Sequence, residues 1–137
     1  MVYAILSGAV LFLVDRWSKK LVQLHVTNGF VACGSFLRIR YVTHLRGCYG
    51  QPSVRIGLLL FWFASLLCAV GLRRLGWWSQ NPSAFFGLGL AFGGAAGNLV
   101  DIWQHGHIVN FVDLRVWPVF NLADLGIVVG LLVALLT

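Results

Sequence analysis

Residues 83–100 read SAFFGLGLAFGGAAGNLV, an apolar run without a charged side chain. Its length is close to the roughly 20 residues that a helix needs to cross the hydrocarbon core of a bilayer. Its glycines and alanines let helix backbones approach closely in lipid, where packing rather than water exclusion drives association. The run therefore predicts a membrane-spanning helix inside a tight bundle, with Asn98 delivered to the bundle interior.

The composition of the whole chain agrees with a membrane protein. Of its 137 residues, 59% are hydrophobic and only 10% are charged, against about 25% charged residues in an average soluble domain. Three further stretches come near the length of a spanning helix. We therefore expect a single membrane domain over residues 1–137, all-α in class, with four transmembrane helices at about 2–24, 56–72, 83–100 and 120–137. Four spans place both termini on one side of the membrane.

A strand pattern occurs in the long connection between the first two spans. Residues 36–42 read FLRIRYV and alternate apolar with basic side chains, which is the period of a half-exposed β-strand. We expect a small surface sheet over about residues 29–50. Most basic residues lie on the side of this connection, so the positive-inside rule alone would place it in the cytoplasm.

The excess of basic residues bears on possible partners. The formal net charge is +6, but the cations are scattered between apolar spans and form no patch on a soluble fold, which argues against nucleic acid. Membrane lipids with anionic headgroups fit better. The pair His105 and His107 has no third ligand at a recognised spacing, so we expect no metal and no cofactor.

The acidic residues are few and lie close to the apolar runs. Four aspartates and no glutamate occur in the chain, and an ionised carboxylate inside a membrane is costly unless it is paired or hydrated. Asn98 and Asp101 are three residues apart, as are Asn121 and Asp124, so each pair lies on one helical face. The alternatives are helix caps and a functional site. The cap reading suits Asn121 but not Asp101, because an anion at a helix C-terminus opposes the helix dipole.

Asp15 and Lys19 form a third pair near the end of the first span. Their spacing of four residues lets the carboxylate and the ammonium pair across one helical turn. Two roles are open: a structural anchor at the membrane interface, with Lys19 extending toward water, or an element that orients the other acids.

Three blocks of the sequence together resemble the lipoprotein signal peptidase family, also called signal peptidase II. They read DRWSK (15–19), FGGAAGNLVD (92–101) and VWPVFNLAD (116–124). The resemblance implies a membrane-embedded aspartic endopeptidase that removes signal peptides from diacylglyceryl-modified prolipoproteins. It also implies a multi-pass protein of the bacterial inner membrane with cytoplasmic termini and an extracytoplasmic sheet. This orientation is the opposite of the one that the count of basic residues predicts. We expect a monomer.

The resemblance assigns one catalytic aspartate to Asp124 and the second to the position of Asn110, because the family's Val-Val-Asp-Phe segment reads IVNF (108–111) here. It makes Asn98, Asp101, Asn121, Asp15, Lys19 and His44 supporting or substrate-binding residues. The sequence departs from the family's motifs at two further places. The arginine that usually follows the Asn-x-x-Asp motif is Ile102, and the motif over the site reads HLRGCYG from His44 to residue 50.

Three accounts of the function remain open on this sequence. The first is a true peptidase in which Asn110 is an introduced, inactivating substitution, or in which Asp113 or Asp101 partners Asp124 instead. Asp113 is a poor substitute if it lies in an irregular or extended loop, because three residues displace a carboxylate by up to about 10 Å. The second is a relative that binds lipopeptide without cleaving it. The third is a small carrier in which Asp15, Asp101 and Asp124 relay protons.

Overall fold

A computed structural model describes residues 1–26, 30–32, 36–44, 51–76 and 81–137. In this part of the chain it contains four helices, α1 (Val2–His25), α2 (Pro52–Arg74), α3 (Pro82–His105) and α4 (Leu122–Leu136). They lie where the sequence predicts helices. The largest differences are at the start of α2, which begins at residue 52 rather than 56, and at the end of α3, which continues to residue 105 rather than 100.

Local sequence signals account for these helix ends. Both α2 and α3 begin with a proline, which suits the first helical turn because its missing N–H would have no partner there. Helix α3 continues until Gly106, whose φ of 75° provides the left-handed residue that commonly follows a helix. Asn121 caps α4. The end of the apolar run therefore does not mark the end of α3.

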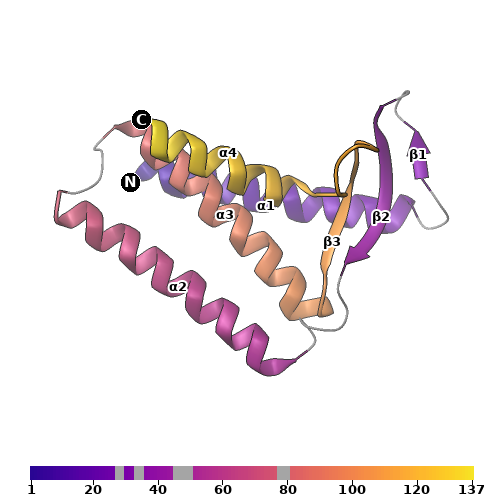
Figure 1. Ribbon diagram of the computed structural model, residues 1–137, viewed down its shortest axis with the longest axis horizontal. Helices are drawn as coiled ribbons and strands as arrows, with labels where there is room; N and C mark the ends of the chain where they lie inside the picture. Colours follow the sequence, from indigo (N-terminus) through magenta and orange to yellow (C-terminus); the bar gives the residue numbers. More distant parts are fainter. Residues whose placement is uncertain (27–29, 33–35, 45–50, 77–80) are drawn as a thin grey trace.

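Helix α3 packs tightly against both α1 and α4, and it lies on the side of these helices that faces α2 (Figure 1). A methyl group added at Gly94 would lie 2.5 Å from the carbonyl oxygen of Ala123, and one added at Gly87 would lie 2.5 Å from that of Gly130. Only glycine permits such an approach of two helix backbones. The prediction that the small residues of α3 serve tight helix packing is confirmed.

Helix α2 stands apart from the other three helices. Among the described elements it packs only on α3, through contacts that include a hydrogen bond of 3.3 Å from the indole N–H of Trp62 to the carbonyl of Phe92. None of its residues is buried. Two cavities lie beside α2, one bounded by α1 and α3 and the other by α3 and α4.

The small sheet differs from the expected one. It contains three antiparallel strands in the order β1 (Phe30–Ala32), β2 (Arg38–His44) and β3 (Ile108–Asp113), with a register shift in β2 between Ile39 and Val42. We expected strands only within residues 29–50, and an irregular or extended connection between α3 and α4. Residues 109–111 are all buried, so β3 lacks the apolar–polar alternation of a half-exposed strand. The sheet thereby joins both connections above the helix ends.

The outer surface of the helices is strongly apolar. Leu60, Phe61 and Leu67 of α2 are each more than 60% exposed, and such a surface suits lipid better than water. Helices α2 and α3 are long and apolar enough to cross a membrane. Helix α4 has 15 residues, and α1 carries charged side chains in its second half. Both termini lie at the same end of the bundle (Figure 1). That the chain crosses the membrane four times stays a prediction.

Candidate active site

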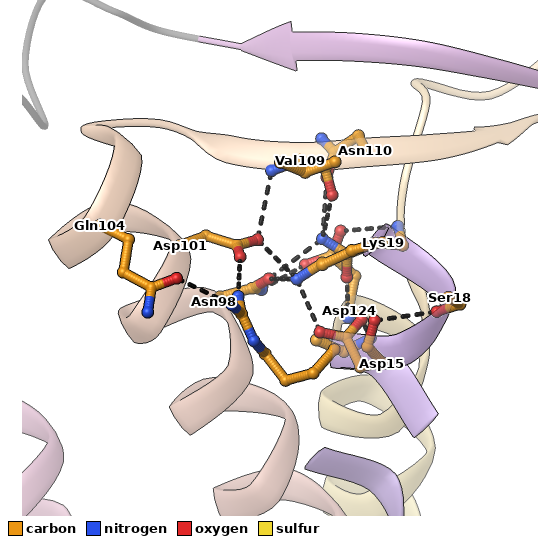
Figure 2. Close-up of polar contacts among 12 residues, drawn as sticks. Asp15, Ser18, Lys19, Asn98, Asp101, Gln104, Val109, Asn110 and Asp124 are labelled. Atoms are coloured by element: carbon orange, nitrogen blue, oxygen red, sulfur yellow. Dashed lines mark hydrogen bonds and ion pairs between the residues drawn. The ribbon is translucent and has the colours of Figure 1, made fainter. Parts of the chain in front are cut away.

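The polar residues gather where the ends of α1 and α3 meet the start of α4, directly under β3 (Figure 2). Lys19 is the centre of this cluster. Its Nζ lies 2.7 Å from Oδ2 of Asp15, 2.7 Å from Oδ2 of Asp101 and 3.1 Å from Oδ1 of Asn98. The side chains of Lys19, Asp15 and Asp101 are at most 2% exposed. An ammonium group has three protons, so each has an acceptor within hydrogen-bond reach.

Asp101 receives a second cation from α1. Nη1 of Arg16 lies 2.6 Å from Oδ1 of Asp101, while Nη2 donates to Oε1 of Gln104 at 2.8 Å. The backbone N–H of Val109 in β3 donates to Oδ2 of Asp101 at 3.3 Å. These contacts explain how a carboxylate persists near the negative end of the α3 dipole: two cations and one N–H surround it.

Asp15 connects α1 to the beginning of α4. Its Oδ1 accepts a hydrogen bond of 2.9 Å from the backbone N–H of Ala123, which is the second residue of α4. The first N–H groups of a helix have no partner inside the helix and favour an anion. Asp15 therefore acts both as a partner of Lys19 and as an anchor for the helix that carries Asp124.

Asp124 differs from the two buried acids. Its Oδ1 accepts from Nδ2 of Asn98 at 2.8 Å, and its Oδ2 accepts from the N–H of Asn121 at 3.2 Å. Within the described part of the chain no salt bridge reaches it, whereas Asp15 and Asp101 are paired with Lys19 and Arg16. Asp124 is also only half-buried. Its negative charge is thus the one that the cluster does not neutralise.

Asn121 links Asp124 to Asn110 and fixes the orientation of Asn110. Oδ1 of Asn121 accepts the backbone N–H of Asp124 at 2.8 Å, as expected of a helix cap. Its Nδ2 is therefore a donor, and the atom of Asn110 that lies 2.9 Å from it must be the oxygen. The one hydrogen bond of the Asn110 side chain in the described part of the chain is made by its Oδ1, so Nδ2 remains available as a donor, and Asn110 is 9% exposed.

Asp113 lies apart from this arrangement. Oδ1 of Asp113 accepts from the N–H of Arg115 at 2.9 Å, and its Oδ2 lies 3.4 Å from Nη2 of Arg40. Asp113 is three residues along β3 from Asn110, so by strand alternation the two side chains point to opposite faces. His44 belongs to β2, where its backbone pairs with Ile108. The side chain of His44 and residues 45–50 of the motif that it begins lie outside the described residues.

An apolar groove leads to the cluster. A cavity of about 800 Å³ lies between α2, α3 and α4, with Leu58, Phe61, Phe92 and Ile127 among its lining residues. Asn98, which donates to Asp124, also lines it. No group of three His, Cys, Asp or Glu side chains in the described ranges could hold a metal ion, and the absence of a metal or cofactor stays a prediction.

The chain also matches proteins of known family. The model of the family described as signal peptidase (SPase) II matches residues 7–137. The chain belongs to the signal peptidase II family. Similar relatives include the lipoprotein signal peptidases of Moorella thermoacetica (30% identical, 94% of this chain, 87% of the relative), Pelotomaculum thermopropionicum (37%, 89% and 82%) and Rhodococcus jostii (43%, 92% and 66%).

The fold of this signal peptidase II family member also occurs in solved structures. A bacterial membrane enzyme superposes with a TM-score of 0.79 over 99% of this chain and 92% of its own chain. A second bacterial membrane enzyme gives a TM-score of 0.78. Both are 20% identical to this chain, so the likeness shows a shared fold.

Two contributors to the site were not predicted from the sequence. The first is Arg16, one of the basic residues near the first connection that entered only the positive-inside count. Its role could have been inferred from Ile102, because the absence of the usual arginine beside Asp101 leaves that buried acid in need of another cation. The second is the set of backbone N–H donors at Val109 and Ala123, which no residue pattern marks. The seven predicted site residues other than His44 and Asp113 do come together in one cluster (Figure 2).

Proposed function

We propose that this chain is a membrane-embedded aspartic endopeptidase that removes the signal peptide from diacylglyceryl-modified prolipoproteins, just before the modified cysteine. The observation that carries the proposal is Asp124. It is a half-buried carboxylate without a cationic partner in the described part of the chain, and Asn98 holds it beside the apolar groove. The lipoprotein signal peptidases among its relatives support the choice of substrate.

The groove suits the apolar part of such a substrate. Its walls are almost entirely hydrophobic, and α2 leaves it open to one side because α2 packs only on α3. A signal peptide and two acyl chains are both apolar, so their burial there is favourable. A peptide bond near Asn98 would meet the polar cluster at the groove's end.

The site can hydrolyse a peptide bond with one carboxylate. Asp124 takes a proton from a water molecule, and the resulting hydroxide attacks the carbonyl carbon. The Nδ2 of Asn110 donates a hydrogen bond to the carbonyl oxygen as negative charge develops on it. Asp124 then returns its proton to the leaving nitrogen as the C–N bond breaks. Asn110 thus replaces the donor function of a protonated acid but cannot transfer a proton.

A second candidate function is lipopeptide binding without cleavage. Asn110 favours it, because neither other nearby carboxylate is free to act as the second acid: Asp15 and Asp101 are buried and ion-paired with Lys19 and Arg16. The same ion pairs argue against a proton carrier, since moving a proton onto either acid would leave the two cations with only one ionised acid between them.

The proposed topology follows the family. The protein would lie in the bacterial inner membrane as a monomer with four crossings, with cytoplasmic termini and an extracytoplasmic sheet. Two features support this arrangement: the termini share one end of the bundle, and the sheet lies at the other (Figure 1). The basic residues that oppose it in the positive-inside count include Arg16 and Lys19, which are engaged in the site and so are not free topology signals.

Cleavage of a diacylated prolipoprotein by the purified chain, followed by gel shift, tests these functions. We expect slow cleavage by the unsubstituted chain and faster cleavage by Asn110→Asp. Cleavage by Asn110→Asp alone would overturn the single-carboxylate mechanism and support the binding function. If neither form cleaves or binds the lipopeptide, while both unfold cooperatively, both candidate functions are wrong.

A further inference from the structure

A second cavity lies between α1 and α3, next to Lys19 and Asp101 of the polar cluster, and it shares no lining residue with the groove. It has a volume of about 410 Å³, and its lining residues include Arg16, Trp17, Lys20, Gln23 and Gln104. Lys20 makes no hydrogen bond or ion pair inside the described ranges and is exposed. Arg16 uses one N–H toward Asp101 and one toward Gln104, so three of its five donors remain for a ligand.

The charges around this cavity favour an anion. Lys19 and Arg16 balance Asp15 and Asp101, and the charge of Lys20 is then left over. Trp17 is 69% exposed beside it. Exposed tryptophan next to basic side chains is typical of the level of lipid headgroups.

A third cavity, this one apolar, continues along the same helices. It also measures about 410 Å³, and its lining includes Ile5, Ala9 and Phe12 of α1 and Gly89 and Ala96 of α3. Helix α2 forms a further wall through Trp62 and Ala69, which also line the groove. On α1, positions 5, 9, 12, 16, 20 and 23 are three or four residues apart and so form one helical face. The apolar and the cationic cavities therefore follow each other along one side of α1.

The dimensions of this surface match one lipid molecule. Lys20 and Ala9 are eleven residues apart, which corresponds to about 16 Å along a helix. The hydrocarbon thickness of one leaflet is about 15 Å, half that of the bilayer. A phosphate near Arg16 and Lys20 would thus place an acyl chain of the same molecule along Phe12 and Ala9.

We propose that the α1–α3 surface is a binding site for one anionic glycerophospholipid, with its phosphodiester at Arg16, Lys20 and Gln104 and an acyl chain in the apolar cavity. The occupant is not the substrate's own lipid, because a diacylglyceryl group carries no phosphate and leaves Lys20 without a counter-ion. The site would hold α1 against α3 close to Asp101. It does not depend on whether the chain cleaves or only binds lipopeptide.

Lipid retention measures this site directly. The purified chain is reconstituted in nanodiscs of phosphatidylcholine with a minor fraction of phosphatidylglycerol, and the lipids retained after release are counted by native mass spectrometry. We expect one phosphatidylglycerol to be retained in preference to phosphatidylcholine. Lys20→Gln should reduce this preference about five-fold, the effect of one basic residue near a lipid phosphate, and Lys20→Arg should preserve it.

Two further variants separate this site from general attraction to the membrane. Arg74→Gln removes an exposed cation at the far end of α2 and should leave the retained phosphatidylglycerol unchanged. Ala9→Phe fills the apolar cavity without altering charge and should reduce retention as Lys20→Gln does. The proposal would be overturned if Lys20→Gln and Arg74→Gln had equal effects, or if both lipids were retained equally. It would also be overturned if excess inorganic phosphate displaced the lipid and Ala9→Phe had no effect.

Discussion

Nζ of Lys19 lies 2.7 Å from Oδ2 of Asp101, so α1 and α3 are joined by a salt bridge whose side chains are 2% and 1% exposed. The same ammonium group holds Asp15, which in turn accepts the N–H of Ala123 at the start of α4. One cation therefore sets the relative positions of three helices. This network supplies cations to the two buried acids, whereas Asp124 has no cationic partner within the described residues.

Removal of Lys19 should destabilise the protein. Lys19→Met leaves Asp15 buried without a cation, and breaking a buried pair in this way costs about 3–5 kcal/mol. We expect the thermal unfolding midpoint in detergent to fall by about 10 °C or more, measured by circular dichroism at one scan rate. Asp101 keeps a cationic partner in this variant, because Arg16 still contacts it.

Two controls accompany the Lys19 variant. Lys20→Met removes an exposed neighbouring cation and should change the midpoint little. Asp15→Asn combined with Lys19→Met removes the uncompensated charge and should recover part of the loss. A midpoint that falls equally in Lys19→Met and Lys20→Met would contradict the assigned role of Lys19.

Asp124 should be indispensable for cleavage, whereas Asp113 should not. Asp124→Asn keeps the shape of the side chain but removes the base that activates water, so we expect cleavage of a diacylated prolipoprotein to fall to background. Asp113→Asn retains an oxygen that can accept from the N–H of Arg115 and should keep most of the rate. Loss of cleavage in Asp113→Asn with an unchanged unfolding midpoint would make Asp113 the second acid.

The sequence predicted the helices and most of the cluster because its signals are local. Apolar runs mark the helices, and spacings of three and four residues place Asn98 with Asp101 and Asp15 with Lys19 on single helical faces. The contact between Arg16 and Asp101 joins residues 85 positions apart, so no periodicity within one helix could indicate it. Strand β3 was missed for a related reason: its burial on consecutive residues follows from tertiary packing.

The close approach of α3 to Asp15 should make Gly97 sensitive to substitution. A methyl group at Gly97 would lie 2.8 Å from Oδ2 of Asp15, so Gly97→Ala must displace this carboxylate or the helix. We expect a loss of stability of about 1–3 kcal/mol, as for overpacked cores, and slower cleavage because Asp15 anchors α4.

Gly71 of α2 provides the matched control for Gly97. No atom lies within 4 Å of a methyl group added there, and alanine is a better helix former than glycine by about 1 kcal/mol. Gly71→Ala should therefore leave the unfolding midpoint unchanged or raise it slightly. If Gly97→Ala behaves in the same way as Gly71→Ala, the packing of α3 against Asp15 is looser than the structure indicates.

The role of Asn110 should be visible in the pH dependence of cleavage. An amide does not titrate in the working range, so Asn110 itself should add no limb to the pH profile of cleavage. Asn110→Asp introduces a second acid beside Asp124, and coupled carboxylates that share a proton give a bell-shaped profile. Asn110→Ala removes the donor to the carbonyl oxygen and should lower the rate by about 10²–10³-fold. If Asn110→Ala cleaved at the same rate as the unsubstituted chain, Nδ2 of Asn110 would not stabilise the developing charge.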